Sequence, residues 1–461
     1  MAQPLAADYG QQFLFPPALE DWVAADHPVR YIREFVDQLD LAALGFSMPA
    51  WVEGRPPYAP GLLLKIWLYG YHQRIRSTRK LEAACRDHLP LIWLAGLHHP
   101  DHNSLWRFWR DNRQGLRQLF RQSVQLAMQA GLVGLVLQAV DGTKIQAAAS
   151  TQGGWSRAKM EAVLAALEAE LDETDQQLEQ EGPSVEAAGY RLPEKLEERQ
   201  ALRQTIKEGL AQLQQEGRHH YHPKEPEARR MQSQGRQPFA YNAQAVVDEA
   251  HGIVVAAEVT REEEDSHQLV GMVQQAQQNT GATVLTVADG NYGTGAQVAL
   301  AQERNLQVLV KPKDGGKVKA NGYSASDFQY QPQSAEVICP QAQRLEFGGE
   351  FQQKGQRIKK YQCRVHHCPV AHLCKDHKGR RIVEIWPHTA AVQAMRARLK
   401  DPTAQAQLAR RGQIIERHFG QIKQHDGFRR WTVRGTQNVR TQWALLNLVS
   451  NLRVLYKHWK N

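Results

Sequence analysis

Two apolar stretches far apart in this chain end in the same dipeptide, Asp-Gly. The first, GLVLQAVDGTKI, ends its apolar run at Asp141, and the second, ATVLTVADGNYG, ends its run at Asp289. Runs of this length and composition are typical of buried β-strands. A third acidic residue, Glu416, lies in the helical segment RGQIIERHFGQIKQ. Two strand ends and a helix can bring three distant carboxylates to one divalent metal site, which is the arrangement that we expect.

Each acidic residue also has an ordinary interpretation. An Asp before a Gly is common in turns, so Asp141 and Asp289 taken singly are typical turn residues. Glu416 taken singly would be a solvated helix residue. The three become informative through their order along the chain and the elements that follow them.

The order of the predicted elements indicates a fold class. Residues 239–247 and 253–259 predict a β-hairpin, and a helix over 266–278 then precedes the strand that ends at Asp289. A helix over 294–303 and a strand over 307–311 follow. With the strand before Asp141, the order is three strands, helix, strand, helix and strand. That order matches the RNase H-like fold, whose mixed sheet gathers acidic residues at adjacent strand ends.

The chain of 461 residues, 42% of them hydrophobic, is long enough for one sizeable core with appended modules. We expect an α+β multidomain protein: an all-α N-terminal domain and an RNase H-like mixed-sheet core, interrupted by a helical hairpin and a small β-rich insertion. The expected divisions are a helical DNA-binding domain over 1–130, core segments over 131–154 and 221–312, the hairpin over 155–220, the insertion over 313–403 and the C-terminal helices of the core over 404–461.

The sequence of the N-terminal domain predicts several short helices. Apolar residues at helical spacing over 29–39 predict one amphipathic helix, and breaks are expected at 74–77, at Pro90 and at Pro100. The helix after Pro100 carries polar and basic residues that could contact DNA bases and phosphates. These residues are Asn103, Ser104, Arg107 and Arg110. The alternative is an ordinary helical bundle with a solvated basic face.

The charge balance favours a polyanionic partner. The chain has 57 Lys and Arg against 48 Asp and Glu, a net charge of +9, although residues 160–217 are rich in Glu. Neither a membrane-length apolar run nor a signal-peptide pattern is found, so a cytoplasmic, nucleoid-associated location is expected.

Heptad-like apolar spacing over 160–217 predicts an antiparallel helical hairpin. This hairpin is either a surface feature without function or a device for oligomerisation or clamping.

Four of the five cysteines cluster in the expected insertion. They are Cys339, Cys363, Cys368 and Cys374. Four thiolates are the number that a tetrahedral zinc site needs, although their spacing is not that of two CxxC knuckles. Histidines 366, 367, 372 and 377 are alternative ligands, and free cysteines that stabilise a small β module are the alternative to a metal. Cys85 is expected in the N-terminal core, and Trp386 either stacks on unpaired bases or packs in a core.

Several segments together resemble those of bacterial insertion-sequence transposases of the DDE superfamily, nearly from end to end. These segments are LKIWLYGY, RSTRKLE, PDHNSLWRFWR, VDGTKIQA, YNAQAVVD, ADGNYG and IIERHFGQIK. The resemblance implies that Asp141, Asp289 and Glu416 hold two Mg²⁺ (or Mn²⁺) ions. It also implies cleavage of double-stranded DNA at element ends, transfer of the freed 3′-OH to target DNA, and a homodimer or larger synaptic complex. Related transposases carry a similar cysteine-bearing insertion.

One departure from the family pattern concerns the glutamate helix. Related transposases often carry an Arg four residues before the Glu and a Tyr further upstream, whereas this chain has Gly412 and no such Tyr, leaving Arg411 as the nearest candidate. Lys423 lies seven residues after Glu416, two helical turns on one face, and is expected to contact DNA phosphate. The alternatives are an inactive or domesticated DNA-binding protein and an RNase H-like nuclease or resolvase without strand transfer.

Overall fold

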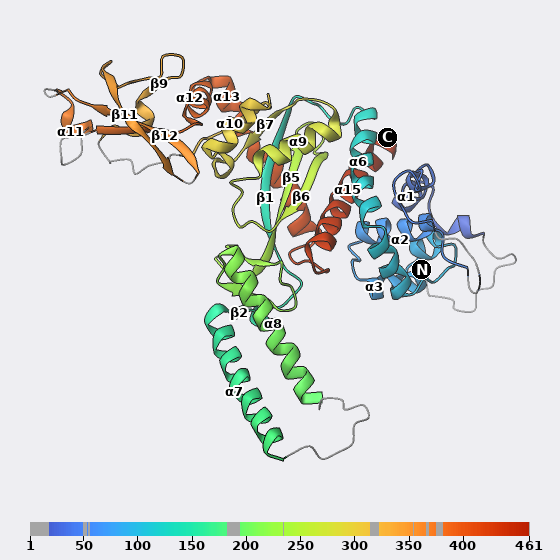
Figure 1. Ribbon diagram of the computed structural model, residues 1–461. Coiled ribbons are helices and arrows are strands. Elements are labelled where there is room, and N and C mark those ends of the chain that lie inside the picture. The colour runs from blue at the N-terminus through green and yellow to red at the C-terminus, as the bar shows by residue number, and fades with distance from the viewer. Residues whose placement is uncertain are drawn as a thin grey trace, which may run out of the picture. The chain divides into compact units, whose positions relative to one another are not determined.

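The computed structural model describes residues 18–48, 53, 56–181, 194–233, 235–313, 322–353, 355–365, 368–374 and 381–460 (Figure 1). The chain forms two compact units. The first contains Met1–Ala130 with Arg440–Asn461, and the second contains Gly131–Val439.

The first unit is helical. Its elements are η1 (Leu19–Trp22), α1 (Pro28–Asp37), α2 (Pro60–His72), α3 (Thr78–Asp87), α4 (Leu89–Leu94), α5 (His102–Asp111) and α6 (Arg113–Gln129). Helix α2 is buried on nearly all sides because its sequence is apolar almost throughout, and the Trp67 ring lies 4.9 Å from the Trp109 ring of α5. The breaks expected at 74–77 and Pro100 are confirmed.

The break expected at Pro90 is wrong by two residues. His88 separates α3 from α4, and Pro90 lies in the first turn of α4. A proline is tolerated there because the backbone N–H groups of the first turn have no partner within the helix.

The last helix, α15 (Thr436–Lys460), extends into the first unit. The Gln442 amide donates to the Tyr71 hydroxyl at 2.8 Å, and the Asn451 amide donates to the Ser123 hydroxyl at 3.2 Å. The sequence predicts that all of 404–461 belongs to the core, whereas the structure groups Arg440–Asn461 with the N-terminal helices. Buried polar groups that find partners on α2 and α6 explain this assignment.

A mixed six-stranded sheet forms the centre of the second unit. Its strands are β1 (Leu137–Gln146), β4 (Arg229–Arg230), β5 (Phe239–Asp248), β6 (Val254–Thr260), β7 (Leu285–Ala288) and β8 (Val308–Val310). The order is β4-β5-β1-β7-β8, with β6 also paired to β5. Strand β5 is antiparallel to β1, β4 and β6, whereas β1, β7 and β8 are parallel. The predicted order of five strands and two helices is confirmed, and β4 is a short edge strand that the sequence did not predict.

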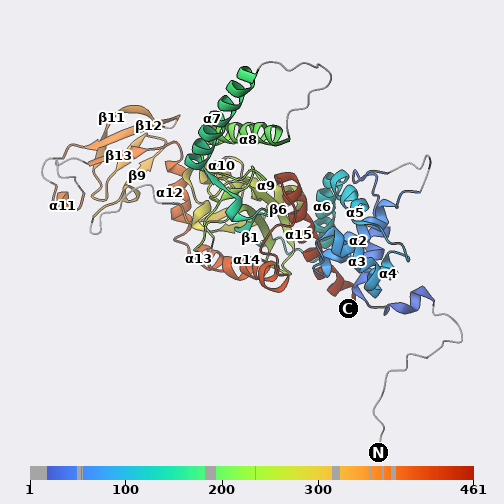
Figure 2. The same cartoon turned by 90° about the horizontal axis from the view of Figure 1, so that it is seen from below.

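Helices cover both faces of this sheet. Figure 2 shows α9 (Leu269–Thr280) and α10 (Gly295–Glu303) on one face, and α13 (Pro402–Ala409) and α14 (Arg411–Gly420) on the other. Helix α9 contacts β5 and β6, whereas α14 contacts β1 and β5. Strand β5 is therefore buried along its whole length, including its polar residues Asn242, Gln244 and Asp248.

The helical hairpin follows β1. After η2 (Thr151–Gly153) come β2 (Trp155–Ser156), α7 (Arg157–Glu181), α8 (Glu194–Glu216) and β3 (His220–Tyr221). Strands β2 and β3 pair antiparallel at its base, and Met160, Leu167, Ile206 and Leu213 form an apolar cluster between the helices. The hairpin was thus predicted correctly. The sequence also predicts a break between its helices at Gly182, Pro183 and Pro193, and these residues lie outside the described part of the chain.

The β-rich insertion is a five-stranded antiparallel sheet in the order β13-β12-β11-β10-β9. Its elements are η4 (Ala325–Asp327), β9 (Gln329–Gln331), β10 (Glu336–Ile338), β11 (Arg344–Gln353), β12 (Gln356–Cys363), α11 (Ala371–Cys374) and β13 (Arg381–Ile385). Helix α12 (Thr389–Arg398) leads back to the core, where it contacts α10.

Among the helices of the described residues, none combines the length and apolar character needed to cross a membrane.

Two glycines of α2 allow a matched test of packing in the first unit. A Cβ on Gly70 would lie 2.3 Å from Leu81 Cδ2, whereas a Cβ on Gly61 would lie 3.6 Å from Leu41 Cδ1, an ordinary contact. We expect Gly70→Ala to lower the free energy of unfolding by about 1–3 kcal/mol through overpacking. Gly61→Ala should raise it by up to about 1 kcal/mol. Urea unfolding followed by circular dichroism measures both, and equal effects would contradict the packing described here.

Candidate active site

Asp141 and Asp289 lie at the same edge of the central sheet. Strands β1 and β7 are parallel, and Val140 is paired with Ala288, so the two aspartates are the next residue on each strand. The Asp289 side chain caps η3 (Gly290–Tyr292), accepting hydrogen bonds from the Gly290 N–H at 2.7 Å and the Asn291 amide at 3.0 Å. Asp289 thus has the turn role that Asp-Gly suggests, and it still lies beside Asp141.

Asp141 is paired with an arginine of the glutamate helix. Its Oδ1 accepts from the Gly142 N–H and its Oδ2 from Arg411 Nη1, both at 2.8 Å. Burial nevertheless raises the pKa of Asp141, and the nearby charge of Asp265 raises it further. The attraction of the Arg411 guanidinium therefore does not fully offset the cost of removing the charged carboxylate from water.

Asp265 is the centre of a polar network beneath β1. Its Oδ1 accepts from Lys144 Nζ at 3.0 Å and from the side-chain amides of Asn242 and Gln244, both at 2.7 Å. Gly142 leaves the space that this network fills, since a Cβ there would lie 2.1 Å from Gln244 Nε2 and 2.6 Å from Asp265 Oδ1. The glycine after Asp141 is therefore required by packing.

Tyr292 is hydrogen-bonded to the network and lies within electrostatic range of both candidate aspartates. Its buried hydroxyl donates a short hydrogen bond to Gln244 Oε1. Burial raises the pKa of Tyr292 well above its usual value, and the charges of Asp265, Asp141 and Asp289 add to the effect. The charges of all three carboxylates thus act on one phenol.

Asp265, Lys144 and Tyr292 are not marked as site residues by any sequence motif. Asp265 ends the acidic run EEED, which is typical of a solvated loop, and Tyr292 follows Asp289-Gly290-Asn291. The one available signal was Lys144, a charged residue that shares a strand face with Gly142 in a buried strand.

Glu416 lies on the exposed side of α14, which packs against β1. Its side chain folds back over Gly412, where an added Cβ would lie 3.1 Å from Glu416 Oε1. The departure from the family pattern at residue 412 therefore leaves room for this carboxylate. Arg411, one residue earlier, supplies the guanidinium that contacts Asp141.

Lys423 lies in a π-helical turn, Gln421–His425, that continues α14. The regular helical spacing expected between Glu416 and Lys423 is thus interrupted, because hydrogen bonds in this turn span five residues. Burial lowers the pKa of Lys423, as do the charges of Arg429 and Lys144, while Asp141 acts in the opposite direction. Lys423 therefore lies within electrostatic range of Asp141.

No three His, Cys, Asp or Glu side chains of the described residues are placed so that they could hold one ion. Asp141 and Asp289 are brought together at the sheet edge with Asp265, and Glu416 comes from the helix that packs on β1. The two aspartates thus lie side by side, and the described residues do not arrange the three candidate carboxylates as a coordination shell.

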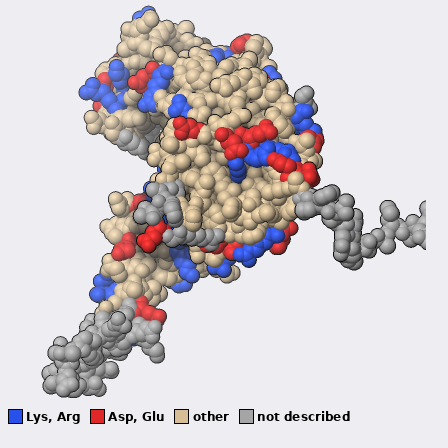
Figure 3. Space-filling model, turned by 90° about the vertical axis from the view of Figure 1, so that its right-hand side faces the viewer, with Lys and Arg blue, Asp and Glu red and all other residues tan. Residues whose placement is uncertain are grey.

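The predicted helix after Pro100 is α5. The Asp101 side chain caps it by accepting from the Ser104 N–H at 2.6 Å, Asn103 and Arg107 are exposed, and Arg110 forms an ion pair with Asp111 at 2.7 Å. Ser104 and Arg107 line a groove of about 480 Å³ in this unit. On the face in Figure 3, Lys and Arg lie beside Asp and Glu, so positive charge is not concentrated there.

The remaining candidates lie elsewhere. Cys85 is buried in α3, as expected, and Cys339, Cys363, Cys368 and Cys374 line one cavity of the insertion. The Trp386 ring stacks on His388 with centroids 5.8 Å apart. His372 lies in α11, whereas histidines 366, 367 and 377 are outside the described residues.

Two families match the sequence. The family described as "Transposase domain (DUF772)" matches residues 17–111, which include α1 to α5, and the family described as "Transposase DDE domain" matches residues 338–456. The second match contains the four clustered cysteines, Glu416 and Lys423, whereas Asp141 and Asp289 precede it. No curated protein matches the chain.

The glycines after the two aspartates should respond differently to substitution. We expect Gly142→Ala to displace the Asp265 network and to lower the free energy of unfolding by at least about 1–3 kcal/mol. A Cβ on Gly290 would lie 3.6 Å from the Lys311 carbonyl oxygen, an ordinary contact. Gly290→Ala should therefore change stability by less than about 0.5 kcal/mol. Thermal unfolding of both variants measures this, and tolerance of Gly142→Ala would refute the close packing at residue 142.

Proposed function

The chain belongs to the DDE transposases of insertion sequences, and we propose that it cleaves phosphodiester bonds at the ends of its element and joins the freed 3′-OH to target DNA through Asp141, Asp289 and Glu416. The observation that carries this proposal is the parallel register of β1 and β7, which sets the two aspartates side by side. The contact between Arg411 and Asp141 adds the start of the glutamate helix to the same site.

The proposed core is RNase H-like. Three strands with antiparallel neighbours are followed by two parallel strands, each reached through a helix, and helices lie on both faces. This topology supports the proposal because it gathers strand ends from distant parts of the sequence at one edge.

Membership of the DDE transposases implies divalent cations, and the residues present suit them. Asp141, Asp289 and Glu416 carry the carboxylate oxygens that Mg²⁺ or Mn²⁺ prefers. Burial raises the pKa of Asp141, so a nearby cation would favour the charged form of this carboxylate. We propose two such ions, held by these three side chains. When bound, they would activate water and stabilise the charge that develops at phosphorus.

Basic residues around the aspartates would position the DNA. Asp141 and Arg411 keep 23% and 22% of their side chains exposed, so substrate can reach both. Arg411 presents a planar donor group suited to phosphate oxygens, whereas Lys423 acts as a point charge. The hydrogen bonds from Lys144, Asn242 and Gln244 to Asp265 hold the backbone that carries Asp141.

The helical N-terminal unit would bind the element ends. Asn103 and Arg107 are exposed on α5, Ser104 lies in the adjoining groove, and these side chains could contact bases and phosphates. Arg110 would leave its ion pair with Asp111 and bind a phosphate instead. Two element ends must be processed together, so we propose that the chain acts as a homodimer or in a larger synaptic complex.

Asp141→Asn and Glu416→Gln should each abolish Mg²⁺-dependent cleavage of a labelled duplex that carries the element end. Both changes remove a charged oxygen ligand while preserving shape, so DNA binding should remain within about twofold of the unmodified protein. Glu303→Gln, at an exposed position at the end of α10, is the matched control and should cleave normally. Tight binding with no cleavage by the unmodified protein would instead favour a DNA-binding protein that lacks catalysis.

Arg107→Ala should weaken binding to the element end and reduce the slope of log K against log salt by about 1, because one phosphate contact is lost. Arg304→Ala, at the end of α10 in the other unit, is the control and should leave the slope unchanged. Fluorescence anisotropy over a range of salt concentrations measures both. An unchanged slope for Arg107→Ala would exclude Arg107 from the phosphate contacts.

A further inference from the structure

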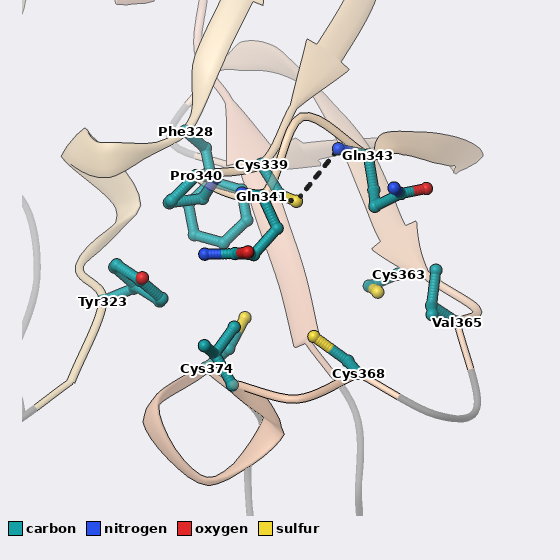
Figure 4. Close-up of a pocket in the computed structure, with 11 residues that line it drawn as sticks. Tyr323, Phe328, Cys339, Pro340, Gln341, Gln343, Cys363, Val365, Cys368 and Cys374 are labelled. Carbon is teal, nitrogen blue, oxygen red and sulfur yellow. Dashed lines mark hydrogen bonds between the residues drawn. The ribbon is translucent and has the colours of Figure 1, made fainter.

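A small cavity in the β-rich insertion is surrounded by sulfur. Its volume is about 20 Å³, which is room for one water-sized group. Figure 4 shows the four cysteine side chains around this space, beside the rings of Tyr323 and Phe328. The four thiols are free in the structure, and Cys374 is buried.

The four cysteines come from separate parts of the insertion. Cys339 follows β10, and Cys363 is the last residue of β12, the strand on the other side of β11. Cys368 lies shortly before α11, and Cys374 is the last residue of that helix. The antiparallel sheet and one short helix thus bring residues up to 35 positions apart, from Cys339 to Cys374, to the same cavity.

The turn after β10 directs backbone donors at one sulfur atom. The N–H groups of Gln341 and Gln343 both donate to Cys339 Sγ at 3.3 Å. Ala342 adopts a φ of 55° in this turn, a left-handed conformation that a residue with a side chain seldom takes. Two backbone N–H groups directed at one sulfur atom are the kind of donors that orient a metal-bound thiolate and offset part of its charge.

A cationic side chain lies beside the cavity. The Arg381 guanidinium lies over the Phe328 ring at 4.6 Å, and its buried Nε has no hydrogen-bond partner in the described part of the chain. A zinc ion with four thiolates carries a net charge of −2. The nearby guanidinium would offset part of that charge.

We propose that Cys339, Cys363, Cys368 and Cys374 together bind one zinc ion, which ties the turn after β10, the end of β12 and α11 into one module. This role is structural and goes beyond the proposed DNA chemistry. In the described residues no three such side chains lie close enough to hold an ion, so the cysteine side chains must turn inward. Binding would release the thiol protons to solvent and form Zn–S bonds of about 2.3 Å.

The metal content of the full-length protein tests this inference. After purification without chelators, elemental analysis should find about one zinc per chain. Cys368→Ser and Cys374→Ser should each lower the zinc content by at least roughly tenfold, because a ligand is lost. Cys85→Ala, at a buried position of α3, is the matched control and should retain the zinc. A Co²⁺-substituted protein should show the intense visible bands of a tetrahedral thiolate site.

A second measurement on the unmodified protein avoids variants that fail to fold. Titration with a mercurial thiol reagent should release zinc in step with thiol modification, as a metallochromic indicator would report. Absence of zinc, together with four readily titrated thiols in the native protein, would overturn the proposal, as would retention of zinc by both serine variants. Asp141→Asn should keep its zinc while losing cleavage. An unmodified protein that cleaves DNA without zinc would refute this inference alone.

Discussion

The candidate site depends on the absence of a side chain at residue 142. Strand β1 lies between β5 and β7, and at Gly142 its backbone passes over the point where Asp265 accepts three hydrogen bonds. Any Cβ would enter that network. Because Asp141 is the preceding residue, the close approach also fixes the backbone from which the candidate carboxylate extends. The requirement for a glycine at residue 142 thus affects the position of β1, the hydrogen bonds of Asp265 and the position of Asp141.

Patterns with a short period predicted much of the fold. The apolar runs before Asp141 and Asp289 identified β1 and β7, and turn residues located the hairpin of β5 and β6. Such signals are local, since they depend on alternation and on residues that favour turns. The partnership of Lys144 with Asp265 is not local: it spans 121 positions and depends on the β1–β5 register, which pairs Lys144 with Asn242. No pattern within one segment encodes it.

The same distinction explains the helical parts. The hairpin α7–α8 was predictable because its apolar residues repeat along two continuous helices. The π-helical turn at Gln421–His425 was not, because an extra residue per turn leaves no mark in composition. The assignment of Arg440–Asn461 to the N-terminal unit likewise depends on tertiary partners, among them Tyr71 for Gln442.

The charges around Asp141 suggest how a polyanionic substrate would be accommodated. Asp141, Asp265 and Asp289 are accompanied by Arg411, Lys144 and Lys423, and burial disfavours the charged forms of both Asp141 and Lys423. A divalent cation beside Asp141 would favour ionisation of its carboxylate and repel the Arg411 guanidinium. The released guanidinium and the partly buried ammonium of Lys423 would both gain from a phosphate nearby. Cation and DNA would therefore each lower the cost of binding the other at this edge of the sheet.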